Sequence, residues 1–83
     1  MRTFYFVGGP RPGCEEVFLR RLQAAGGPPA GWSIYPHAGG DGKALHIARV
    51  ESSAAIAAHL ALFTTVYEST EPIEVIDARD REG

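Results

Sequence analysis

Four polar ring side chains stand among apolar or strand-forming neighbours in this sequence: Tyr5, Tyr35, His37 and His46. Histidine has an ordinary pKa of about 6.5 and moves a proton at neutral pH, and a tyrosine hydroxyl can hold a phenol or enolate oxygen. His46, His37 and Tyr35 are therefore the candidate catalytic residues. His46 comes first because it interrupts an apolar run, where an ionisable ring is costly unless it is paired or useful.

These residues also have a purely structural interpretation. Ser33, Tyr35 and His37 share one face of a strand by period two, but a slip of one residue in register sends such a set to the opposite face. His46 can be a packed, hydrogen-bonded histidine within a sheet, and Tyr35 and His37 can be surface residues of an edge strand. The strand register decides between the two interpretations.

A ligand would need a cavity, and one helical segment favours it. Between residues 53 and 67 alanines alternate with a stripe of larger apolar residues, and small side chains can leave space between a helix and a sheet. Trp32 offers an aromatic wall or, alternatively, a support beneath a hairpin. The candidate ligand-binding residues are Tyr5, Trp32, Ile56, Leu60 and Phe63.

Other potentially reactive residues favour structural roles. His37, His46 and His59 lack the close spacing of a zinc site, and Cys14 at a helix start has no base nearby in sequence. Residues 8–13 match neither a dinucleotide-binding fingerprint nor a phosphate-binding loop, and two prolines remove backbone donors. We expect no metal and no cofactor.

Six elements are expected to position these residues. Residues 14–25 have apolar side chains at helical spacing, acidic residues in the first turn and Gly26 after the last. Pro36 places its strand at a sheet edge, and residues 39–42 supply hairpin turn chemistry. Ser52 and Ser53 are candidate N-caps of a second helix. The expected elements are strands at 3–7, 32–37, 44–50 and 73–78 and helices at 14–25 and from about 52 to 67.

The element order β-α-β-β-α-β predicts one ferredoxin-like α+β domain over residues 1–83. Its four-stranded antiparallel sheet has the first and third strands in the centre and both helices on one face. Residues 4–7 and 44–50 are apolar at consecutive positions, so both faces of the sheet need cover. A chain of 83 residues buries only about 60–65% of its unfolded surface. We therefore expect a homodimer made through the sheet faces.

Composition excludes several classes of partner and location. A net charge of −2 and a pI near 5.8 provide no basic face for nucleic acid, and the expected third strand has no aromatic residue to stack a base. No segment approaches the ~20 apolar residues of a membrane span. Cys14 alone cannot form an internal disulfide, and Met1 leads directly into a strand rather than a signal peptide. A cytoplasmic protein is expected.

The chain resembles the dimeric α/β-barrel superfamily, especially its short members of unknown function. The resemblance lies in the element order, the chain length, the segment 32–37 before the hairpin and the run 67–75 into the last strand. The resemblance implies ferredoxin-like subunits that pack sheet against sheet. Members of that superfamily include cofactor-free monooxygenases, muconolactone-type isomerases, polyketide cyclases and haem-degrading enzymes. Some haem-binding members use a histidine on the second helix, where His59 lies here.

Two functional hypotheses follow. The first is a cofactor-free cyclase, isomerase or oxygenase that acts on a hydrophobic cyclic or polyketide-like metabolite, with His46 or His37 as base and Tyr35 as hydrogen-bond donor. The second is a non-enzymatic dimeric module that binds a small molecule or serves as an accessory subunit. Fold alone does not choose between them.

Overall fold

The two consecutive apolar runs form the central strands of an antiparallel sheet. In the computed structural model, which describes residues 1–76, β1 (Arg2–Pro10) pairs with β3 (Ala44–Val50) and sets Phe6 opposite His46. The sheet order is β2-β3-β1-β4, with β2 (Trp32–Pro36) and β4 (Tyr67–Ser69) on either side of the central pair. A fifth short strand, β5 (Ile73–Val75), pairs with the first half of β1.

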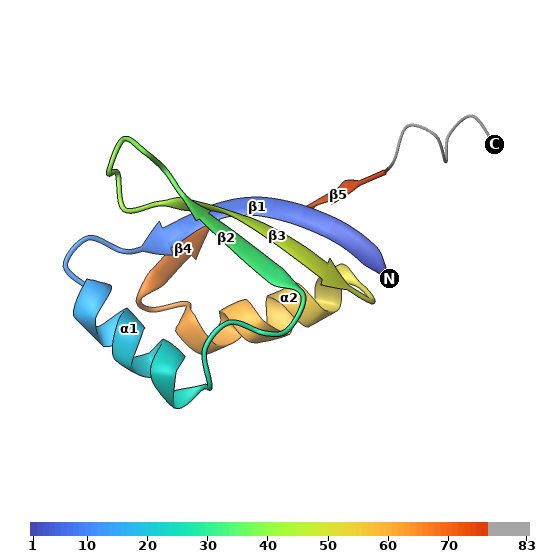
Figure 1. Ribbon diagram of the computed structural model, residues 1–83. Helices are drawn as coiled ribbons and strands as arrows, with labels where there is room; N and C mark the ends of the chain where they lie inside the picture. Colours follow the sequence, from blue (N-terminus) through green and yellow to red (C-terminus); the bar gives the residue numbers. More distant parts are fainter. Residues whose placement is uncertain (77–83) are drawn as a thin grey trace.

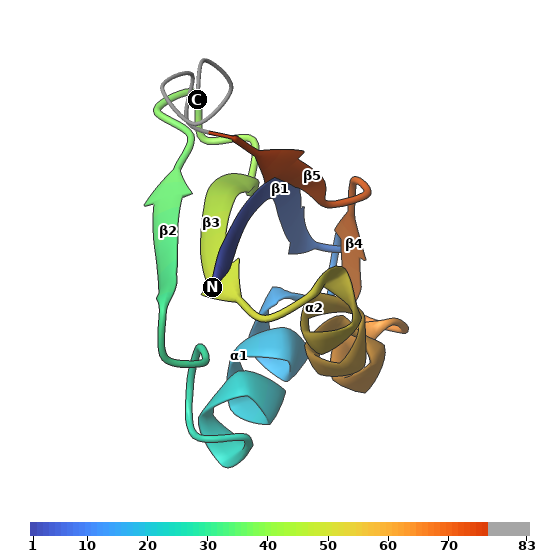
Figure 2. The same ribbon diagram turned by 90° about the vertical axis from the view of Figure 1, so that its right-hand side faces the viewer.

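Both helices cover the same face of the sheet (Figures 1 and 2). α1 (Glu15–Ala24) has two glutamates in its first turn and Arg21 in its last, which suits the helix dipole. Gly26, with φ of 90°, follows its end in the left-handed conformation that glycine adopts readily. α2 (Ser53–Leu60) continues as the 3₁₀ turn η1 (Ala61–Phe63).

The core lies between this helical layer and the sheet. Alternate β1 and β3 side chains, Phe4, Phe6 and Ala48, pack with Ile56 of α2. A second cluster is formed by Phe63, Val66 and Tyr67, which pack against the partly buried Phe18 and Leu22 of α1. Leu60 contacts both clusters, so the two halves of the core are joined through the end of α2.

The α+β class, the antiparallel sheet and the central position of β1 and β3 agree with the sequence analysis, and the arrangement is compatible with a ferredoxin-like fold. Within the described residues β2 pairs only with β3, which confirms that Pro36 lies in an edge strand. The β2–β3 hairpin extends past the end of the sheet (Figure 1).

Three predicted boundaries are wrong. β1 runs on through Pro10, because Gly8, Gly9 and Pro10 pair with β4 instead of forming a loop. The second helix ends before residue 67, since the β-branched run at 64–66 disfavours helix. The expected strand at 73–78 begins at Ile73 as predicted but ends at Val75 as β5, and β4 was not predicted. Residues 77 and 78, like the charged tail at 79–83, lie outside the described residues.

The alanines of α2 do not create the space that the sequence suggested. Ala54, Ala55, Ala57 and Ala58 are exposed on the outer side of the helix, so their small size leaves no gap against the sheet. Among residues 1–76, no helix is long and apolar enough to cross a membrane.

Candidate functional site

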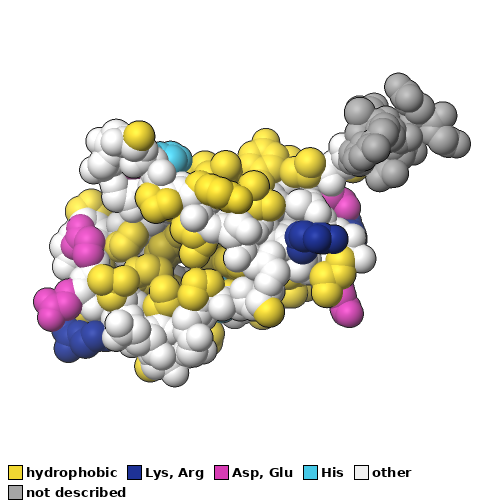
Figure 3. Space-filling view, viewed as in Figure 1, with side chains coloured by type: hydrophobic (Ala, Val, Ile, Leu, Met, Phe, Trp, Pro, Cys, Tyr) yellow, Lys and Arg dark blue, Asp and Glu magenta, His cyan; other side chains and the backbone are white. Residues whose placement is uncertain are grey.

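A cavity opens between the sheet and the two helices, beside the edge strand β2. On the face shown in Figure 3, hydrophobic side chains surround a hollow between these layers. The enclosed part of the cavity measures about 30 Å³, and the space between its walls out to the open mouth measures about 330 Å³. Its walls are formed by Phe18, Leu22, Pro28, Trp32, Ile34, His46, His59, Leu60, Phe63 and Tyr67.

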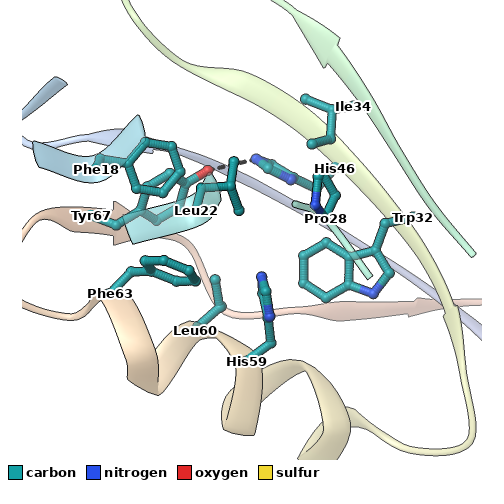
Figure 4. Close-up of a pocket in the computed structure, with 10 residues that line it drawn as sticks. All are labelled: Phe18, Leu22, Pro28, Trp32, Ile34, His46, His59, Leu60, Phe63 and Tyr67. Atoms are coloured by element: carbon teal, nitrogen blue, oxygen red, sulfur yellow. Dashed lines mark hydrogen bonds between the residues drawn. The ribbon is translucent and has the colours of Figure 1, made fainter. Parts of the chain in front are cut away.

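His46 and Tyr67 form a hydrogen-bonded pair in this cavity, with 2.6 Å between Nε2 of His46 and the Tyr67 hydroxyl oxygen (Figure 4). Each residue is only 7% exposed. Burial lowers the pKa of His46 below its usual value, an effect that the backbone of Gly8 opposes and the neighbouring His59 reinforces. Burial raises the pKa of Tyr67 to about 12. Both residues are therefore uncharged at neutral pH.

The hydrogen-bond count favours one tautomer of His46. Nδ1 is buried and has no hydrogen-bond partner among residues 1–76. If the Tyr67 hydroxyl donates to Nε2, the ring proton is on Nδ1 and only this one donor is unpaired. The reverse arrangement leaves both Nδ1 and the Tyr67 proton unpaired, which costs more in an apolar interior. Tyr67 is therefore assigned as the donor, and its oxygen keeps a free lone pair.

Two strands and a stacked ring hold the pair in place. His46 projects inward from β3 and stacks on Phe6 of β1, with ring centroids 4.6 Å apart and planes 5° from parallel. Tyr67 begins β4 on the other side of β1 and packs against Phe18 of α1, with centroids 4.8 Å apart. The hydrogen bond therefore crosses β1, which separates the two strands.

A third polar ring lines the same cavity. His59 rises from α2 toward the sheet (Figure 4), with its ring edge-on to Trp32 at 5.0 Å and to Phe63 at 5.2 Å. Burial lowers the pKa of His59 as well. No cluster of three or more potential metal-ligating side chains occurs among the described residues.

The structure separates the four polar rings that the sequence singled out. Tyr5 lies opposite Ile47 and Tyr35 lies opposite Leu45, so both tyrosines are on the sheet face away from the helices, while His46 is on the helical face. Tyr5 and Tyr35 are thus not in the cavity. Side chains at neighbouring positions of a strand point to opposite faces of a pleated sheet, so the strand register decides which polar rings share a face.

His37 also lies outside the cavity. It follows the end of β2, in the hairpin, where its Nδ1 is 3.1 Å from Oδ2 of Asp41. The other oxygen of Asp41 accepts a hydrogen bond from the backbone of Lys43. His37 therefore closes the exposed hairpin turn, as its structural interpretation anticipated, and does not contact His46.

Only some of the proposed ligand-binding residues line the cavity. Trp32, Leu60 and Phe63 line the cavity as expected. Ile56 is fully buried in the core cluster with Phe4 and Phe6 and does not line it. Cys14 packs against the second cluster, consistent with a core role.

The sequence analysis did not identify Tyr67 as a site residue, because it was placed at the end of the second helix. A weak signal was present: Thr64, Thr65 and Val66 are consecutive β-branched residues, which disfavour a continued helix, and they form a turn before Tyr67. Arg11, in the glycine- and proline-rich segment 8–13, donates to the backbone oxygen of Thr64 at 3.3 Å.

Comparisons with models of protein families, with curated proteins and with solved structures find no match to this chain. The resemblance to the dimeric α/β-barrel superfamily thus stays a prediction based on element order, and the functional argument depends on the geometry of the cavity.

Proposed function

We propose that the protein binds a small, mainly apolar molecule in the cavity and moves a proton on it through Tyr67 and His46, without a cofactor. The observation that carries this proposal is the 2.6 Å hydrogen bond between the two residues within an otherwise apolar cavity. A buried polar pair with shifted pKa values, in a concave apolar site, is the usual setting of acid–base chemistry.

The pair can work as a relay. The free lone pair of the Tyr67 oxygen accepts a proton from the bound molecule as the tyrosine passes its own proton to Nε2 of His46. The imidazole becomes positively charged, and the substrate becomes an enolate or similar anion. Because burial lowers the pKa of His46, the ring returns this proton readily.

Such a base suits a reaction that takes a proton from one atom and returns it to another. Isomerisation and cyclisation of a hydrophobic cyclic or polyketide-like metabolite have this form, and cofactor-free oxygenation begins with the same deprotonation. In this scheme Tyr67 replaces Tyr35 as the group that touches the substrate, and His46 keeps its proposed role as base. We expect this chemistry to take place in the cytoplasm.

Two observations favour the non-enzymatic alternative, a module that only binds a small molecule. The enclosed part of the cavity, about 30 Å³, has room for one functional group of a ligand, and the remainder of the ligand lies in the open mouth. His46 and Tyr67 also partner one another, as structural groups do.

We further propose that the working form is a homodimer joined through the outer sheet faces, as in a dimeric α/β barrel. The side chains on this face are mostly apolar, and none of the described helices covers them (Figure 2). Tyr5, Tyr35, Ile73 and Val75 are between 37% and 54% exposed. Contiguous apolar surface of this kind is uncommon on monomers and is typical of interfaces. The polar residues of this face are Thr3, Ser33 and Arg49, and its apolar residues are Tyr5, Val7, Tyr35, Leu45, Ile47, Ile73 and Val75.

The test combines ligand detection with proton exchange. Native mass spectrometry of freshly purified protein should show a co-purified molecule that His46→Asn and Tyr67→Phe lose and the hairpin control His37→Asn retains. In D₂O, NMR should show faster α-proton exchange of 2-indanone with wild type and His37→Asn than with either cavity variant. Ligand retention without faster exchange would favour the binding module, and the absence of both would contradict the proposed function.

A further inference from the structure

We infer that His59 is a second ligand-binding group of the cavity, and that the ligand is a neutral single-ring molecule with a polar group at each of two opposite ends. One end lies at the Tyr67–His46 pair on the sheet and the other at His59 on α2. This inference rests on the proposed function and adds the class of molecule that the site takes.

His59 is available for such a contact. It lines the cavity, and no hydrogen bond joins its ring to any other residue among 1–76. Figure 4 shows the ring directed from α2 toward the sheet, between Trp32 and Phe63. The ring nitrogens of His59 are not among the buried unpaired atoms, so they stay accessible from the cavity mouth. A ligand group that lies in the mouth can therefore reach them.

The two polar ends lie on opposite walls. Tyr67 and His46 belong to β4 and β3 of the sheet, whereas His59 belongs to the helical layer that faces them. Trp32 reaches both histidines, with ring centroids 6.1 Å from His46 and 5.0 Å from His59. A molecule that spans the cavity therefore lies along the Trp32 ring with one polar end at each wall.

The ligand is neutral because the cavity offers no counter-charge. None of its ten described lining residues is Asp, Glu, Lys or Arg. Burial keeps both histidines uncharged at neutral pH, since it lowers the pKa of each. Transfer of an ion from water into such surroundings without a partner costs several kcal/mol.

The walls favour a single ring. Phe18, Trp32 and Phe63 provide aromatic surface on three sides. The enclosed part measures only about 30 Å³, and the space of about 330 Å³ between the walls includes open solvent, so most of a bound ring lies in the mouth. A single six-membered ring is the smallest such unit that carries polar groups at two opposite ends.

The test uses three probes of nearly the same shape with no, one and two hydroxyl groups: p-xylene, p-cresol and hydroquinone, the last under nitrogen. Trp32 is the only tryptophan, so its indole N–H gives a single reporter signal at the cavity wall in ¹H–¹⁵N NMR titrations. For wild type we expect affinity to rise along the series, with hydroquinone about fivefold or more above p-cresol, since a net hydrogen bond contributes about 0.5–1.5 kcal/mol.

Variants show which wall of the cavity provides each increase in affinity. His59→Leu should reduce the hydroquinone to p-cresol affinity ratio to no more than about two, the statistical factor from two equivalent ends. Tyr67→Phe should remove the preference of p-cresol over p-xylene. The control His37→Leu, which removes a histidine outside the cavity, should keep both ratios at the wild-type values.

The outcomes separate the two proposals. A wild-type ratio of two or less, or an unchanged ratio in His59→Leu, would overturn the role of His59. If p-cresol still binds in a Tyr67-dependent way in that case, the proposed function stands. If none of the three probes moves the Trp32 signal, the cavity does not take such rings and both proposals fail.

Discussion

A β-carbon at Gly8 would lie 2.7 Å from Cε2 and 2.9 Å from the hydroxyl oxygen of Tyr67. The absence of a side chain on β1 thus lets the tyrosine ring lie across the strand and reach His46 on the other side. Gly8 does not touch the cavity ligand in this scheme, so it is a positioning residue for the pair.

Gly8→Ala should displace Tyr67, break its hydrogen bond to His46 and lower the free energy of unfolding by about 1–3 kcal/mol, the usual cost of overpacking a core. Urea denaturation measures the loss, and ultraviolet titration should show the pKa of Tyr67 shifted from its wild-type value. The matched control is Gly39→Ala, because a β-carbon there meets nothing within 4 Å. Equal stability of the two variants would mean that the ring does not depend on Gly8.

Tyr67→Phe keeps the ring and removes the hydroxyl, so the buried Nε2 of His46 loses its partner. We expect the free energy of unfolding to fall by about 1–3 kcal/mol, the cost of an unpaired buried polar group. Thr64→Val is the control, since it removes a hydroxyl in an exposed turn away from the outer sheet face, and its effect should be below about 0.5 kcal/mol. A Tyr67→Phe variant as stable as wild type would show that the hydrogen bond contributes nothing net.

Stability should fall on acidification below about pH 6.5. The folded pKa values of His46 and His59 are lowered by burial, so the unfolded chain binds protons that the folded chain resists. The free energy of unfolding is therefore constant near pH 7 and decreases as the pH falls below the unfolded histidine pKa.

The measurement is urea denaturation at several pH values between about 5 and 7.5. The carboxyl groups of Asp41 and Glu74, whose pKa values are lowered from 3.8 and 4.5, titrate below this pH range and do not contribute to the measured change. His46→Gln should flatten the dependence, and His59→Gln should flatten it partly. A wild-type stability that rises on acidification would contradict the neutral state of these rings.

The proposed dimer should dissociate when a charged side chain is introduced in its interface. Ile47 lies near the middle of the outer face, opposite both Tyr5 and Ser33, and Ile47→Lys would bury an unpaired ammonium group in the interface. Analytical ultracentrifugation should show a dimer for wild type and a monomer for this variant. Leu19→Lys on α1, at a residue 54% exposed away from the sheet, should remain dimeric. A wild-type monomer at micromolar concentration would refute the interface.

The sequence by itself predicted the first five elements in their observed order, from β1 to α2, but not the strand β4. Apolar side chains at helical spacing identified α1, Pro36 identified the edge strand, and two unbroken apolar runs identified β1 and β3 as the central strands. These features depend on residues that are close together in the sequence. Hydrophobic periodicity and turn-forming residues therefore predict them without knowledge of the tertiary structure. The end of α2 was predicted too late, because the apolar stripe continued at helical spacing to Tyr67. The short β-branched run at 64–66, which disfavours helix, was the weaker signal.

Only the tertiary structure decided which polar rings meet. Side chains on a strand alternate between faces, so the register that sets Phe6 opposite His46 also sends Tyr5 and Tyr35 to the outer face. Tyr67 reaches His46 from 21 residues away in sequence, across a strand that is open there because residue 8 is glycine. No local pattern encodes a contact between strands that are separated by a third, because it depends on pairing registers that the whole core selects.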